Sequence, residues 1–502
     1  METEHVYKQT RYLRKLHPLW IGFKLFKSIK SLIAFILFLF IILDISSNSL
    51  FSIYGISLIA LFVIYQVGTT ILEWKRFGYY LNQKELFVQK GQFVMMKRYF
   101  PLENIQGINQ NTSFIHRILG LTSLLIDVGS SDNNSSVKLE MISLKEADNI
   151  KKTLSKYSNI HLNDQVKKEV KEEELKTNSK KRASFTEKNH YEIKLSEILI
   201  ASLTSLRLLF FLSVLYSIYS QLSEFLSIEE YINKALIFFR HSAEMMILGV
   251  ILLIVSSMAY GLLKTYIQYG GLKVTSDSYR IYIEKGIGSK TSFSIPKDKI
   301  QALNINSGFI HKMLSIVNVK LISSTDIKDE DVKASNILFP FINNKKVIKL
   351  IPEVLPSFEI TRSITKIPKR SLYVKLLRSM YIWLLLPVSI VLFFPGFWYI
   401  ALLIFIITIT SQMLSGLFSG YSLNGPFLQL KKIAITNRMF IMRKDKIERI
   451  MITETMIQRK LGLSSLKVTT RARPAKVITM HDIPIQIAHK CQRWFVEEVE
   501  NP

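Results

Sequence analysis

The sequence predicts an α+β membrane protein in which three transmembrane helical hairpins, six spans in all, are each followed by a small β-rich unit with a C-terminal capping helix. Three observations lead to this fold class. The composition is 48% hydrophobic yet 21% charged, which indicates apolar membrane segments alternating with soluble ones. Long apolar runs occur in pairs along the chain. A short polar motif returns once after each pair, at Asn111–Leu121, Asn306–Ile316 and Glu454–Leu463.

Each hairpin consists of two apolar runs near the roughly 20 residues that a helix needs to cross about 30 Å of hydrocarbon. The fifth run carries Pro387 in its interior and is therefore expected to be a kinked helix rather than a re-entrant one. Arg207, in the third run, is an intramembrane charge that either pairs within a polar pathway or extends to the interface. The runs are Ile29–Leu43 with Leu50–Leu72, Ile198–Leu222 with Met245–Leu263, and Leu376–Phe394 with Trp398–Phe418.

The distribution of charge predicts the orientation in the membrane. Basic residues fill the N-terminal arm and follow the second and fourth runs, at Lys75, Arg76 and Lys264, whereas the loops inside the hairpins are acidic. Because basic flanks stay in the cytoplasm, both termini and all three β-rich units are expected there. The net charge of +27 favours an anionic phospholipid membrane as the neighbour. Nucleic acid is not expected as a partner, since no aromatic-interleaved basic motif is present.

Strands and a closing helix are predicted around each copy of the motif. Alternation of apolar and polar residues, rich in β-branched and aromatic types, is typical of half-buried antiparallel strands. A closing amphipathic helix is marked by capping-box spacing at Ser143 and by Pro484 in a first helical turn. The strands are expected within Glu85–Tyr99, Tyr279–Ile295 and Leu428–Arg443 upstream, and within Ser123–Val128, Val317–Ser323 and Ser464–Thr470 downstream.

The motif itself is predicted to be a short helical turn. We expect Phe114, Ile115, Leu119 and Leu121 to pack into the sheet, with the following glycine allowing a tight exit. Gly120 and Gly462 hold the glycine position, whereas Ser315 replaces it in the second copy, and Gln458 replaces the histidine in the third. The basic pairs His116-Arg117, His311-Lys312 and Arg459-Lys460 are predicted to point away from the sheet.

The domain organisation follows from these patterns. We define a module as one hairpin with the β-rich unit that follows it. Asp164–Lys194 is dense in Lys and Glu and is expected to be a tether between modules. The predicted order is an N-terminal arm with hairpin 1 (1–78), unit (79–160), charged linker (161–194), hairpin 2 (195–270), unit (271–351), linker (352–375), hairpin 3 (376–422) and unit (423–502).

The order of hairpin, strands, "IQ…FIHRILGL" motif, strand and closing helix resembles bacterial PH-like membrane proteins of the YdbS/YdbT type. Three modules resemble the longer YdbT form, and the resemblance covers nearly the whole chain. It implies that each β-rich unit is a split barrel of pleckstrin-homology (PH) shape, held at the cytoplasmic face of a bacterial plasma membrane. A smaller PH-like membrane protein of the same family is a candidate partner.

The candidate contacts with anionic lipid or a protein partner are basic. A basic loop close to the bilayer gains on the order of 1 kcal/mol per charge from anionic lipid. The alternative for each position is a solvated basic corner of the surface. The candidates are His116, Arg117, His311, Lys312, Arg459 and Lys460 in the motif, and Arg471, Arg473 and Lys476 around an expected hairpin tip.

Neither catalysis nor a metal or other cofactor is expected. The histidines are scattered, no HExxH motif occurs, and the single cysteine, Cys491, excludes an intrachain disulfide and a thiolate zinc cage. We therefore predict a non-enzymatic platform whose three units bind the membrane surface or protein partners, with a role in envelope stress tolerance or export. The alternative is a transporter-like or lipid-handling protein in which the units gate a path between the hairpins.

Overall fold

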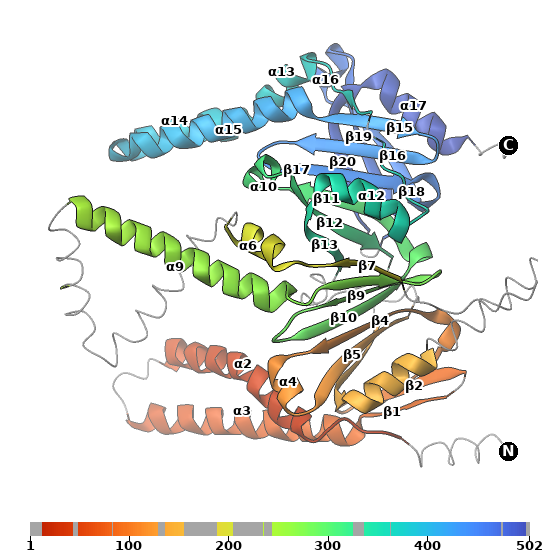
Figure 1. The fold of residues 1–502 in the computed structure, drawn as a ribbon. Coiled ribbons are helices and arrows are strands. Elements are labelled where there is room, and N and C mark those ends of the chain that lie inside the picture. Colours follow the sequence, from red (N-terminus) through yellow and green to blue (C-terminus); the bar gives the residue numbers. More distant parts are fainter. Residues whose placement is uncertain are drawn as a thin grey trace, which may run out of the picture. The chain divides into compact units, whose positions relative to one another are not determined.

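The computed structural model describes residues 13–43, 49–82, 84–128, 136–154, 188–203, 234, 243–324, 336–361, 363–472 and 475–497 (Figure 1). The chain divides into two compact units. Unit 1 comprises Met1–Ser184 and Ser289–Phe293, and unit 2 comprises Phe185–Gly288 and Ser294–Pro502. Apolar helices and antiparallel strands occur in both, so the predicted α+β class is confirmed.

Unit 1 holds the first module. A helix at 144–154 covers the sheet with Ala147 and Ile150, which join Leu124 and Leu139 in one apolar core. The side chain of Ser143 accepts a hydrogen bond from the amide of Glu146 at 3.2 Å, as the capping-box spacing predicts. The elements are α2 (Leu19–Leu43), α3 (Ser49–Arg76), a sheet of β1 (Gly78–Leu81), β2 (Glu85–Lys90) and β3 (Met96–Pro101), the 3-10 turn η2 (Leu102–Asn104), β4 (Ile105–Thr112), α4 (Phe114–Ile118), β5 (Leu121–Val128) and β6 (Ser136–Ser143).

The remaining elements follow the same order twice more. The second module contains α6 (Leu195–Leu203), α9 (Ala243–Tyr269), β8 (Lys273–Ser276), β9 (Arg280–Lys285), β10 (Lys290–Pro296), η3 (Lys297–Lys299), β11 (Ile300–Ser307), α10 (Phe309–Met313), β12 (Ile316–Ser323), β13 (Ile337–Asn343) and α12 (Asn344–Val354). The third contains α13 (Arg370–Arg378), η5 (Tyr381–Leu385), α14 (Leu386–Phe393), η6 (Pro395–Phe397), α15 (Trp398–Phe418), β15 (Gly420–Asn424), β16 (Phe427–Ile433), β17 (Asn437–Arg443), η7 (Lys444–Lys446), β18 (Ile447–Thr453), α16 (Met456–Lys460), β19 (Leu463–Thr470), β20 (Val477–Pro484) and α17 (Ile485–Val496).

Strands of the second and third modules share one sheet in unit 2. Its order is β13-β12-β11-β17-β16-β15-β14, so β11 of the second module lies beside β17 of the third. The two strands are antiparallel, and Leu303 lies opposite Ile441. β14 (Thr365–Lys366) and β7 (Lys188–Glu192) lie in segments predicted as linkers, and they pair with β15 and β8. The second and third modules are therefore joined by backbone hydrogen bonds as well as by a linker.

Among the described residues, three helices are long and apolar enough to cross a membrane. They cover Gly55–Arg76, Ile247–Tyr269 and Pro395–Phe418, which correspond to the second, fourth and sixth predicted spans. Arg370–Arg378 and Tyr381–Phe393 form a bent pair at 55° that makes a fourth candidate, at the place of the fifth span. The first predicted span lies within α2, and most of the third, with Arg207, lies outside the described residues.

The bend in the fifth run lies before Pro387, not at it as the sequence suggested. The hydroxyl of Ser379 donates to the carbonyl of Lys375 at 2.8 Å where α13 ends, and the π-helical turn η5 follows. Pro387 falls in the first turn of α14, where a missing amide donor costs little. A local change in helix winding therefore produces the bend.

The exit from each short motif helix takes the left-handed backbone conformation that the sequence indicates. Gly120 has φ 66° and Gly462 has φ 63°. Ser315 occupies the same position in the second copy with φ 55°, so the turn is kept although the glycine is lost. The three copies of the motif therefore end in the same backbone turn, and the second copy carries a small amount of backbone strain.

Candidate functional site

The short helices α4, α10 and α16 expose most of their apolar side chains. Phe114 is 63% exposed, Met313 74% and Met456 88%. The prediction that Phe114, Ile115 and Leu119 pack into the sheet is therefore wrong, although Leu121, the first residue of β5, is buried. The buried residue of α4 is His116 and that of α16 is Gln458.

His116 takes the inward position in unit 1. Ser113 caps α4 by accepting a hydrogen bond from the amide of His116 at 3.4 Å, and the histidine is only 4% exposed. Its ring lies 4.9 Å from the ring of Phe23 on α2. Burial, and then the charge of Lys27, lower the pKa of His116. His116 is therefore a packing residue between α4 and the first hairpin, and its predicted contact with lipid head groups is wrong.

Unit 2 contains both other inward residues. His311 is half-buried, with its ring 6.2 Å from that of Phe341, which also contacts Tyr269 at the end of α9. In the third copy, Thr455 and Gln458 form a capping box in which each side chain bonds the other's backbone amide, at 3.0 and 3.3 Å. Gln458 is thereby turned into the interior, as His116 is in unit 1.

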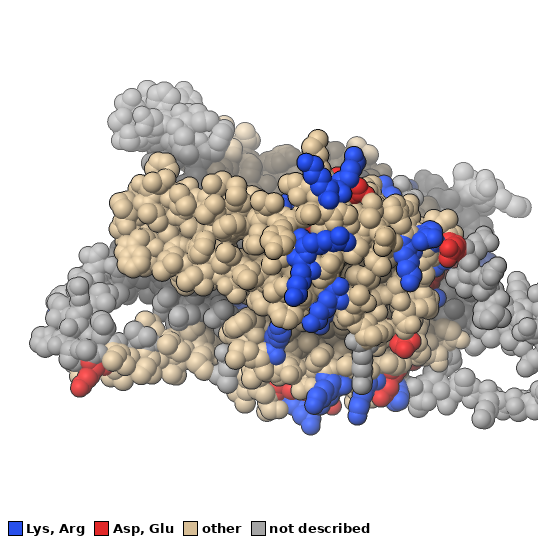
Figure 2. Space-filling model, turned by 90° about the horizontal axis from the view of Figure 1, so that it is seen from above, with Lys and Arg blue, Asp and Glu red and all other residues tan. Residues whose placement is uncertain are grey.

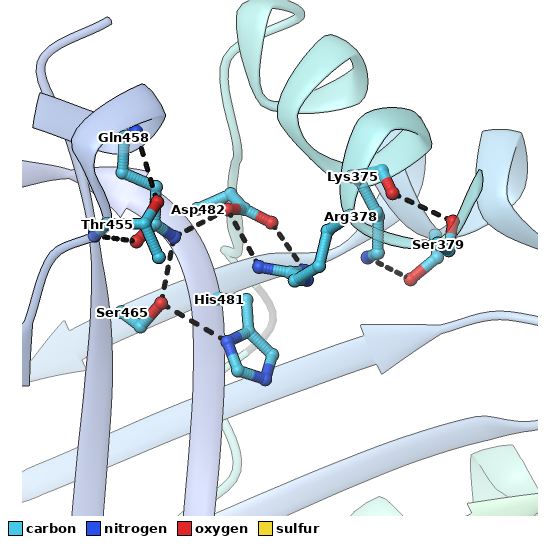
Figure 3. Close-up of polar contacts among 9 residues, drawn as sticks. Lys375, Arg378, Ser379, Thr455, Gln458, Ser465, His481 and Asp482 are labelled. Carbon is cyan, nitrogen blue, oxygen red and sulfur yellow. Dashed lines mark hydrogen bonds and ion pairs between the residues drawn. The ribbon is translucent and has the colours of Figure 1, made fainter. Parts of the chain in front are cut away.

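Gln458 joins a polar network at the end of α13, the first helix of the third hairpin (Figure 3). Its Nε2 donates to the carboxylate of Asp482 at 2.7 Å and to the hydroxyl of Ser465 at 2.9 Å. Asp482 is fully buried and accepts two further hydrogen bonds from the guanidinium of Arg378, at 3.2 and 2.9 Å. Arg378 is the last residue of α13, so the network joins the third copy of the motif to the helix that leads into the apolar hairpin.

The backbone of Asp482 explains why its side chain reaches this place. Asp482 has φ 63°, a left-handed conformation that aspartate tolerates better than most residues. It lies two residues before the end of β20, and the β19 and β20 pairing shifts register between Ser464 and Leu466. Met141, two residues before the end of β6, has φ 54° beside a similar register shift. The last strand of both modules is thus bulged near its end.

Where the first hairpin meets its sheet, a different strand carboxylate pairs with a cation on the hairpin helix. Glu140 on β6 accepts a hydrogen bond from Nε1 of Trp20 at 2.8 Å and lies 3.1 Å from Lys138 and 3.8 Å from Lys27 on α2. Burial raises the pKa of Glu140, but Lys138, Trp20 and Lys27 together outweigh burial and hold that pKa below its usual value. In both modules a strand carboxylate therefore pairs with a cation on the first hairpin helix.

A family model described as Bacterial PH domain matches residues 32–158, 208–355 and 381–499. The chain belongs to the bacterial PH domain family. The resemblance drawn from the motif is thereby confirmed. The chain is also 25% identical over 442 residues to the UPF0699 transmembrane protein YdbT of Bacillus subtilis (strain 168), an alignment that covers 87% of this chain and 88% of that protein. Membership of this family and the candidate membrane helices agree on a membrane protein built from repeated bacterial PH domains.

Among the described basic candidates, His116 is buried and His311 is half-buried, whereas the others lie on the surface. Arg117, Lys312, Arg459 and Lys460 are exposed, and Arg459 lies 3.6 Å from Glu454. In Figure 2, Lys and Arg side chains gather beside the tan projection formed by α14 and α15 of unit 2. Arg471 and Lys476 are exposed on the two sides of the turn between β19 and β20, where the amide of Thr470 donates to the carbonyl of Lys476 at 3.1 Å, and Arg473 lies outside the described residues.

The sequence reasoning missed Arg378 and Asp482 as site residues. A signal was present, since Asp482 is an aspartate in the strand pattern VITMHDIP and Arg378 is a cation at the border of an apolar run. Neither signal indicates that Arg378 and Asp482 pair with each other, because they are 104 residues apart in the sequence. Among the described residues, no three His, Cys, Asp or Glu side chains are grouped so that they could hold a metal ion.

Proposed function

We propose that this bacterial PH domain protein is a six-span plasma-membrane protein whose three cytoplasmic PH domains bind the anionic surface of the bilayer and hold a platform for protein partners there. Both termini lie in the cytoplasm in this proposal. A role in envelope stress tolerance or export would use that platform. Figure 1 supports the arrangement for unit 2, where α9 and α15 leave the sheets on the same side.

The observation that carries the proposal is the pairing of exposed apolar and basic side chains on the motif helices. Met456 and Ile457 are exposed on α16 beside Arg459 and Lys460. Apolar side chains with neighbouring cations are typical of segments that enter the head-group region of anionic membranes. If α16 were a corner of the surface exposed only to water, the exposed side chain of Met456 would contribute no favourable contact there.

The contacts of α4 and α16 support a position near the level where, in this proposal, a hairpin enters the membrane. The network of Gln458 and Asp482 ends on Arg378, which precedes the apolar segment starting at Tyr381 by three residues. In unit 1, His116 packs on Phe23, less than two turns before the apolar run that starts at Ile29. The apolar side chains of α4 and α16 therefore lie close to the proposed membrane interface.

The test measures how close α16 lies to lipid in the full-length protein. Met456→Cys is labelled with an environment-sensitive fluorophore, and the protein is reconstituted in phosphatidylglycerol and phosphatidylethanolamine vesicles that contain brominated lipid. Native Cys491 does not compete for the label, because it is buried and burial raises the pKa of its thiol to about 11. We expect strong quenching at position 456, reduced by the charge reversals Arg459→Glu and Lys460→Glu.

Val477→Cys is the matched control. Val477 is exposed at the start of β20, at the end of that strand opposite to Asp482. We expect its label to be quenched weakly. Equal quenching at positions 456 and 477 would remove membrane contact as the role of the motif helix.

A further inference from the structure

The pairing of β11 with β17 shows how one PH domain accepts a strand from the next. β11 is the first strand of the second half of its module, and β17 is the last strand of the first half of the following module. Their register runs from Ala302 opposite Met442 to Ser307 opposite Asn437. Because the pairing covers the apolar residues of both strands, Leu303 and Ile441 are completely buried.

β18 is the counterpart of β11 in the third module. Each follows a 3-10 turn with the same sequence, Lys297-Asp298-Lys299 before β11 and Lys444-Asp445-Lys446 before β18. In the part of the chain that the structure describes, β18 pairs with β19 alone and ends its sheet. Ile450, at the place of Leu303, is only half-buried, and Met451 is 39% exposed.

β3 is the counterpart of β17 in the first module. It precedes the 3-10 turn η2 as β17 precedes η7, and it ends the described sheet β1-β2-β3. Tyr99 stands at the place of Ile441 and is 51% exposed, whereas Ile441 is buried. Among the described residues, the chain thus presents counterparts of both halves of the interface between PH domains, a β18 edge in unit 2 and a β3 edge in unit 1.

We propose that β18 of one copy pairs antiparallel with β3 of a second copy, so that the protein assembles head to tail by the same strand pairing that joins its second and third modules. Ile450 through Thr453 is an uncharged run of β-formers, which suits strand addition. A heterologous contact of this kind repeats along the membrane, since each added copy again presents a free β18. Transferring the β11 and β17 register places Ile450 opposite Tyr99 of the next copy.

The register gives a direct test that does not depend on lipid binding, so its outcome is separate from that of the proposed function. Full-length proteins that carry Ile450→Cys or Tyr99→Cys, with different tags, are mixed in mild detergent and oxidised. We expect a disulfide-linked dimer that contains both tags. Neighbouring residues of a strand point to opposite faces, so Met451→Cys mixed with Tyr99→Cys should cross-link several-fold less.

Three results would overturn the proposal. One is equal cross-linking of positions 450 and 451 to position 99. Another is a disulfide that forms only when both cysteines are in the same chain, which would mean that the chain closes on itself. The third is a wild-type protein that stays monomeric by light scattering at every concentration while Ile450→Cys in native membranes cross-links only to a smaller protein of the family. Thermal unfolding of each variant confirms that the cysteine substitutions leave the fold intact.

Discussion

The guanidinium of Arg378 and the carboxylate of Asp482 form a two-bond ion pair between residues 104 positions apart, with distances of 3.2 and 2.9 Å. The aspartate is fully buried, and the arginine keeps part of its surface exposed. Because Arg378 ends α13 and Asp482 lies on β20, this pair fixes the third hairpin to the third PH domain.

Arg378→Ala is expected to lower the free energy of unfolding by on the order of 3 kcal/mol, because it leaves the carboxylate of Asp482 buried without its countercharge. Asp482→Asn should cost less, since asparagine also accepts the left-handed backbone and keeps a hydrogen-bond acceptor. The double variant should cost less than the sum of the two. Thermal unfolding in mild detergent measures all three. Arg370→Ala, an exposed arginine on the same helix, is the control and should have little effect.

His116 should make the protein less stable in acid. Its pKa is lowered by burial and by Lys27 from a usual value of 6.5, so the folded state binds fewer protons than the unfolded state below that pH. The stabilisation from the neutral ring is complete above pH 6.5 and is lost as the pH falls through the lowered pKa. His116→Phe keeps the contact with Phe23 and should flatten the acid limb of stability against pH. A parallel limb in wild type and variant would contradict this explanation.

The left-handed exit of the motif helix predicts opposite effects for two substitutions. Ser315→Gly should stabilise the protein by about 0.5 kcal/mol, because glycine removes the backbone strain at φ 55°. The greater conformational entropy of glycine in the unfolded chain offsets part of this gain. Gly120→Ala should destabilise it by about 1 kcal/mol through backbone conformation alone, since an added Cβ meets no atom within 4 Å. Gly22→Ala, at an open helical position without a positive φ, serves as the control in the same unfolding assay.

The proposed topology can be checked with reporter fusions. Reporters placed after residues 160, 357 and 502 should all give a cytoplasmic signal, since each follows an even number of proposed spans. Alkaline phosphatase and green fluorescent protein report opposite sides of the membrane and control for expression. A signal from outside the cytoplasm at any of the three positions would show that a span has been miscounted.

The sequence predicted the elements better than their contacts. Alternation in segments such as Leu428–Arg443 located β16 and β17, and the spacing of Gly120 and Gly462 located the motif exit, because both patterns are local. The inward direction of His116 was missed because a five-residue helix has no periodicity to read. The pairing of Leu303 with Ile441 was missed because no local pattern names a strand partner in another module.

The sheet shared by the second and third modules also sets an order of events during synthesis. Leu303 is translated before its partner Ile441, which lies about 140 residues further along. At roughly 5–20 residues per second the ribosome needs about 7 to 28 seconds to reach Ile441. During that interval the edge of β11 that pairs with β17 is open, and in the proposed topology the third hairpin enters the membrane before this edge is closed. The late stage of biogenesis, after most of the chain has been translated, is therefore when this protein is most exposed to misassembly.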